Sequence, residues 1–99
     1  MGKISATDLE RKISATDLER QIFEKEEIRV VIRAPRNALF NEYNYERKAA
    51  VNTSITDWYN TRLKPILGDN YDADIIDGFG TNPHGRTGIE RVRNSYAEK

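Results

Sequence analysis

The sequence contains no cysteine, which excludes disulfide bonds, thiol catalysis, zinc–cysteine sites and iron–sulfur clusters. His84 is its only histidine, so a conventional zinc or non-haem iron site is disfavoured. No apolar run approaches the roughly 20 residues that a membrane span needs, and no apolar segment behind Met1 marks a signal peptide. We therefore expect a cytoplasmic protein with no metal, no cofactor and no membrane partner.

The chain is short and rich in charge. Of its 99 residues, 37% are hydrophobic and 32% are charged, which suits one small domain with a thin core. The formal net charge is zero, but residues 28–50 hold five Lys/Arg against two Asp/Glu, and residues 69–80 hold four Asp and no Lys/Arg. Such local fields matter more to a charged partner than the total does.

The N-terminus carries an exact tandem duplication. Residues 3–11 read KISATDLER, and residues 12–20 repeat all nine letters. A repeat fold needs about three or more units of roughly 20 to 50 residues, so this pair does not form one. We expect residues 1–15 to be a surplus segment in front of one domain at residues 16–97.

The geometry of a helix explains why one copy is surplus. Nine residues turn a straight helix by about 900°, or two and a half turns, so the apolar residues of the two copies point to opposite sides. The first copy is then either mobile or an extension of the first helix. In the second arrangement Leu9 and Ile13 are exposed, and the chain self-associates through them.

Hydrophobic periodicity and caps predict an α+β domain of order α-β-β-α-β-α, with a three-stranded sheet and helices on one face. The Thr16–Glu19 capping box starts the first helix, and Pro65 ends or kinks the second. The predicted elements are a helix at 16–26, strands at 28–34, 39–47 and 72–79, a helix at 54–64 and a C-terminal helix after Thr87. A helix at 41–50 is the alternative to the second strand. The predicted core comprises Leu18, Ile22, Val30, Ile32, Ile55, Trp58, Leu63, Ile66 and Ile75.

One face of this sheet is a candidate binding surface. If Val30 and Ile32 face the core, Arg29 and Arg33 face outward. In a hairpin they lie beside Tyr43, Tyr45 and Arg47 of the next strand. Arginine with exposed aromatics is typical of single-stranded nucleic-acid binding and equally of protein-binding hot spots.

The loop at residues 80–88 is a second candidate. Gly85 and Gly88 allow backbone N–H groups to converge, and Arg86 adds positive charge at the start of the next helix. Arg91 and Arg93 on that helix add two further cations for phosphate. The acidic residues of 69–77 do not follow calcium-loop spacing, because Ile76 stands where an EF-hand loop that starts at Asp72 needs a ligand.

These patterns predict a small non-enzymatic binding module. The first hypothesis is DNA or RNA binding through the Arg/Tyr face and the glycine loop, although zero net charge weighs against it. The alternative is a protein-binding regulator or inhibitor that uses the same surface or the acidic 69–77 stretch. A metal-independent ribonuclease that uses His84, Arg86 and a tyrosine is the third.

Overall fold

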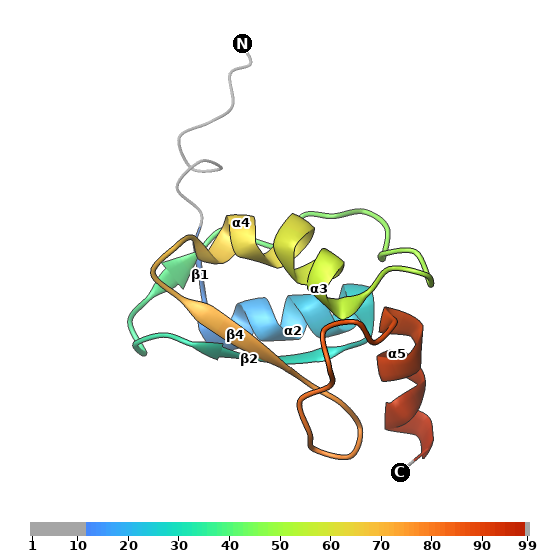
Figure 1. The fold of residues 1–99 in the computed structure, drawn as a ribbon. Coiled ribbons are helices and arrows are strands. Elements are labelled where there is room, and N and C mark those ends of the chain that lie inside the picture. Colours follow the sequence, from blue (N-terminus) through green and yellow to red (C-terminus); the bar gives the residue numbers. More distant parts are fainter. Residues whose placement is uncertain (1–11, 99) are drawn as a thin grey trace.

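The computed structural model describes residues 12–98, and they form two short antiparallel sheets with helices packed against them (Figure 1). The predicted α+β class is therefore confirmed. In chain order the elements are β1 (Ile13–Ser14), α2 (Ala15–Glu26), β2 (Arg29–Arg33), β3 (Leu39–Phe40), α3 (Ile55–Trp58), η1 (Tyr59–Leu63), α4 (Lys64–Leu67), β4 (Asp72–Ile76) and α5 (Ile89–Glu98).

Helix α2 begins earlier than the predicted capping box. Ser14 is extended, with φ −72° and ψ 166°, and its hydroxyl accepts a hydrogen bond from the N–H of Asp17 at 3.1 Å. Since Ser14 already belongs to β1, its backbone has the geometry that a cap requires. Glu19, the predicted partner of Thr16, instead accepts from the N–H of Ile32 at 2.8 Å.

The second helical segment continues through Pro65 because its middle is widened. Helix α3 passes into η1, a π-helical stretch at Tyr59–Leu63, which leads into α4. Proline has no N–H and crowds the carbonyl four residues earlier, which here is Thr61. A π turn relaxes the hydrogen-bond ladder at that point, so the helix ends at Leu67 rather than near Lys64.

The predicted three-stranded sheet is not confirmed. Strand β2 pairs with β4, with Val31 opposite Asp74, whereas β3 pairs with β1. The backbone of residues 41–50 is neither strand nor helix, because side chains of α2 bind it. The N–H of Tyr43 donates to Oε1 of Gln21 at 2.9 Å, and that of Ala49 donates to Oε1 of Glu26 at 2.8 Å.

The core lies between α2, the α3–α4 segment and one face of the β2–β4 sheet (Figure 1). All nine predicted core residues are buried except Ile66, which is partly buried against the others. Ile13 also packs against this core and pairs with Phe40, so the arrangement in which an extended first helix leaves Ile13 exposed is wrong. Leu9 and the rest of the first copy lie outside the described residues.

Candidate functional site

The structure does not assemble the predicted Arg/Tyr face, because Tyr43 is buried. Only 6% of Tyr43 is exposed. Its hydroxyl donates to Oε2 of Glu26 and accepts from Nε1 of Trp58 at 3.0 Å. Burial, together with the Glu26 carboxylate, raises the pKa of Tyr43 far above its ordinary value, so the hydroxyl keeps its proton. A tyrosine held in this way is not available to stack on a base.

Arg93 is also buried rather than displayed on α5. Its side chain is 3% exposed and lies against Glu26, with Nη2 3.0 Å from Oε1 of that carboxylate. Its Nε donates to the backbone carbonyl of Glu26 at 2.7 Å. Arg93 therefore binds the end of α2 rather than a phosphate.

Glu26 is the centre of this polar cluster. The residue is 0% exposed, and its carboxylate accepts from Tyr43, Ala49, Arg62 and Arg93. Burial acts to raise the pKa of Glu26, but the hydrogen bonds from Tyr43, Ala49 and Arg62 outweigh it, so the pKa lies below its ordinary value. A buried carboxylate that is fully paired in this way is a structural group that joins α2, the 43–49 segment, the α3–α4 segment and α5.

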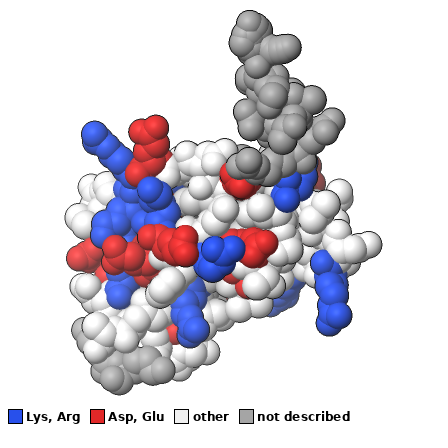
Figure 2. Space-filling model, turned by 180° about the vertical axis from the view of Figure 1, so that it is seen from behind, with Lys and Arg blue, Asp and Glu red and all other residues white. Residues whose placement is uncertain are grey.

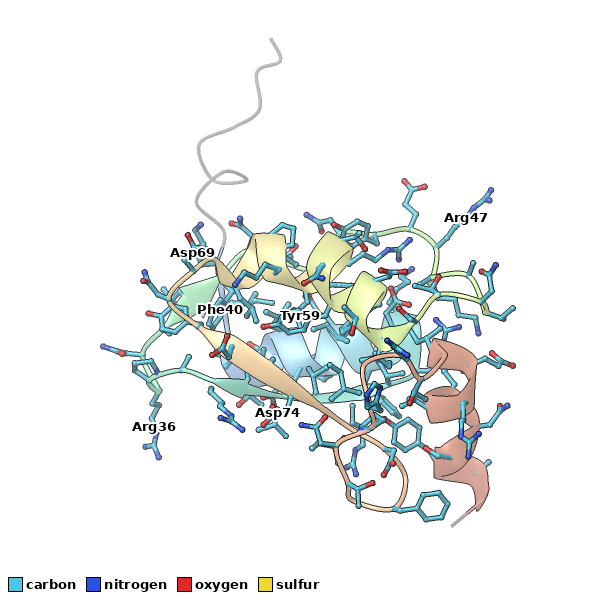
Figure 3. All side chains as sticks on the ribbon, viewed as in Figure 1. Arg36, Phe40, Arg47, Tyr59, Asp69 and Asp74 are labelled. Carbon is cyan, nitrogen blue, oxygen red and sulfur yellow. The ribbon has the colours of Figure 1, made fainter. Side chains whose placement is uncertain are left out.

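Tyr45 and Arg47 lie in the segment that covers this cluster. Tyr45 is partly buried, and the guanidinium of Arg62 stacks 4.5 Å from its ring centroid. The side chain of Arg47 points away from the body (Figure 3), while its carbonyl accepts from Nη1 of Arg62 at 2.6 Å. Of the predicted tyrosines, neither is free to bind a base with its full ring.

The glycine loop uses its backbone groups internally. The carbonyl of Gly85 accepts from the N–H of Thr56 at 3.0 Å, and Gly88 forms a β-bridge with Ser54. The N–H of Arg86 donates to Nδ1 of His84 at 3.1 Å. These bonds fasten the loop to the start of α3, while the side chains of Arg86 and Arg91 remain exposed.

The acidic stretch is likewise used within the fold. Asp74 on β4 pairs with Arg33 on β2. Asp77 accepts from the N–H groups of Phe79 and Thr81 and from the hydroxyl of Thr81, which together lower its pKa. Within residues 12–98, no group of three or more His, Asp or Glu side chains is placed to hold a metal ion.

Arg29 and Arg33 are exposed on the open face of the β2–β4 sheet, on either side of Val31. Arg29 has no ion pair among the described residues, whereas Arg33 has Asp74. Figure 2 shows one face of the molecule, on which Lys and Arg are interspersed with Asp and Glu. Of the cations in residues 28–50, Arg33 pairs with Asp74 and Lys48 pairs with Glu27, so part of that positive charge is paired within the fold.

A groove beside β2 is the feature that sequence reasoning missed. We call it the α2–β2 groove; its volume is about 700 Å³. Glu19, Arg20 and Phe23 of α2 line one side, and Arg29, Val30 and Val31 of β2 line the other. Phe23 is 47% exposed and Val31 is 50% exposed.

Tyr96 of α5 also lines the groove. Its ring meets Phe23 edge-on, with centroids 6.3 Å apart. Its hydroxyl accepts from the N–H of Arg29 at 2.8 Å and donates to the carbonyl of Ile76 at 2.5 Å. The sequence held one signal of this groove, namely Phe23 on the outer side of an otherwise amphipathic helix.

Comparison of the chain with protein-family models, with curated proteins and with solved structures gives no match. Among the described helices, none has the length and apolar character needed to cross a membrane.

Proposed function

We propose that the chain is a small non-enzymatic module that binds another protein through the α2–β2 groove. The observation that carries the proposal is the pairing of exposed Phe23 and Val31 across one groove. Scattered exposed apolar residues are normal, but apolar side chains that line a common groove are typical of a binding site. Aromatic residues and arginine, which both line this groove, are the commonest hot-spot residues at protein interfaces.

Nucleic-acid binding remains the second candidate, supported by the exposed side chains of Arg29, Arg33, Arg47, Arg86 and Arg91. These cations lie on β2, in two loops and on α5, and Tyr43 and Arg93 are withdrawn into the core. A single strand needs a continuous basic track with stacking platforms. The observed dispersal favours the protein partner.

Selection from a random peptide library on the immobilised full chain tests the proposal. The selected peptides are then measured on Phe23→Ala, on Val31→Thr and on the control Val51→Thr, which changes a 60% exposed valine outside the groove. We expect binding to fall on the first two variants and to be retained on the third. A thermal melt of each variant checks that the fold is intact.

A titration with oligonucleotides tests the alternative function, nucleic-acid binding. Single- and double-stranded DNA and RNA are titrated at two salt concentrations. Nucleic-acid binding requires affinity that falls with salt by a log–log slope of roughly −0.7 to −0.9 per phosphate contact. Oligonucleotide binding with this salt dependence would overturn the proposal. Selected peptides whose affinity is unchanged by both Phe23→Ala and Val31→Thr would also overturn it.

A further inference from the structure

We infer that the partner is an extended, acidic segment of another protein that adds as a third, antiparallel strand to the outer edge of β2. This inference rests on the proposed function and specifies the chemistry of the partner. In Figure 1, β2 runs below α2, while α5 and the loop after β4 extend lower still; within residues 12–98 the only strand that pairs with β2 is β4. A strand edge that no other strand covers is the template for β-strand addition.

The hydrogen bonds show which backbone groups of β2 face outward. The N–H of Arg29 points to the β4 side, where the hydroxyl of Tyr96 joins it to the carbonyl of Ile76. Because backbone groups alternate along a strand, those of Val30 and Ile32 point to the opposite, outer edge. The contact between the N–H of Ile32 and Glu19 agrees with this assignment.

An antiparallel strand on this edge has a defined side-chain pattern. Val30 and Ile32 form the hydrogen-bonded pairs, so Arg29, Val31 and Arg33 occupy the non-hydrogen-bonded positions, where opposing side chains come closest. Opposite charges at such positions attract, and like charges repel. The added strand is therefore expected to place an apolar residue opposite Val31 and an acidic residue opposite each arginine.

The same charges disfavour a second copy of this chain as the occupant. Two β2 strands paired antiparallel about Val31 place Arg29 of each chain opposite Arg33 of the other. Both cross-strand pairs are then repulsive. The arginines of β2 therefore disfavour pairing with a second copy of this chain and favour pairing with an acidic segment.

Glu19 competes with an added strand for the outer edge of β2. Its carboxylate occupies the outward N–H of Ile32, which an added strand needs for its own carbonyl. A charged side chain on an edge is a usual protection against unwanted pairing. Because the partner must displace Glu19, a variant without this carboxylate should bind an acidic strand more tightly.

The test uses the blocked peptide Thr-Glu-Thr-Val-Thr-Glu-Thr and its counterpart with Lys in place of Glu. Both are titrated into the ¹⁵N-labelled full chain and followed by NMR. We expect the Glu peptide to bind and to shift the amides of Val30, Val31 and Ile32, with the Lys peptide weaker. Methylating the amide nitrogens of peptide residues three and five, which face β2, should abolish binding; methylating four and six should not.

Charge variants give the matched controls. Arg29→Glu should weaken the Glu peptide by about three- to tenfold and strengthen the Lys peptide, because it reverses one cross-strand pair. Arg47→Glu reverses a charge outside the groove and should change neither. Glu19→Ala should tighten the Glu peptide. Equal binding of both peptides, or a loss of affinity in Glu19→Ala with the fold intact, would overturn the inference.

Two further outcomes separate this inference from the proposed function. If the Glu peptide does not bind, but library peptides of other composition bind the groove, the strand-addition inference fails and the protein-binding function stands. If no peptide of either kind depends on the groove, both fail. A dimer in sedimentation velocity that Arg29→Glu alters would identify a second copy as the occupant and would also overturn the inference.

Discussion

Replacing Glu26 with Gln should destabilise the protein by about 3–5 kcal/mol, the usual cost of removing one partner of a buried ion pair. The change keeps the size of the side chain and removes its charge. Arg93, with its side chain 3% exposed, then retains a buried charge with no carboxylate at Nη2. A domain of this size has a total stability of about 5–15 kcal/mol, so the expected loss is a large part of it.

Urea denaturation measures this loss directly. Trp58 is the only tryptophan and donates to Tyr43 within the cluster, so its fluorescence reports on this part of the core. Glu24→Gln on the exposed side of the same helix is the control and should change the stability by less than about 0.5 kcal/mol. Adding Arg93→Met to Glu26→Gln should cost less than the sum of the two single changes, because the residues are directly coupled.

The pH dependence of the unfolding free energy tests whether the charge of Glu26 stabilises the fold. The pKa of Glu26 is lowered in the folded protein, so its contribution is present above the unfolded value, near 4.5, and is lost as the pH falls through the lower folded value. Glu26→Gln should therefore show a smaller loss of stability on acidification than the wild type. A variant that loses less than about 1 kcal/mol at neutral pH would refute the buried-pair reasoning.

Three other expectations follow from single contacts. Gly78→Ala should unfold or strongly destabilise the domain, because a Cβ there would lie 2.1 Å from the carbonyl oxygen of Ser95, whereas Gly88→Ala meets nothing within 4 Å and should be mild; thermal melts of both compare them, and similar melting temperatures would contradict the clash. Tyr96→Phe removes the hydroxyl that joins β2 to β4 and should cost about 0.5–1.5 kcal/mol in a urea titration; an unchanged midpoint would show that water replaces it. A chain that starts at Lys12 should fold with unchanged stability by circular dichroism, and loss of the cooperative transition would show that the first copy belongs to the domain.

Hydrophobic periodicity alone determined much of the fold. The position of Val30 and Ile32 between arginines predicted β2, and the spacing of Leu18 and Ile22 predicted α2. Both predictions hold because the apolar side chains of each element must be buried in the core. The spacing of Ile55, Trp58 and Leu63 did the same for the second helical segment. These patterns involve residues that are close in sequence, so they can be recognised without the tertiary structure.

Only the tertiary structure decided which strands pair and which charges are buried. The composition of residues 39–47 suits a strand, yet Gln21 binds the backbone N–H of Tyr43 within it, and Glu26 binds that of Ala49 just beyond it. Only Leu39–Phe40 forms a strand. Glu26 and Arg93 are 67 positions apart, and no local pattern shows that two charged residues will share one buried site. Long-range pairing of this kind depends on how the elements pack, because burial of a charge is tolerated only where its partner arrives from elsewhere in the chain. For the same reason the uncovered edge of β2, and with it the groove, depends on long-range packing, because β3 pairs with β1 and not with β2.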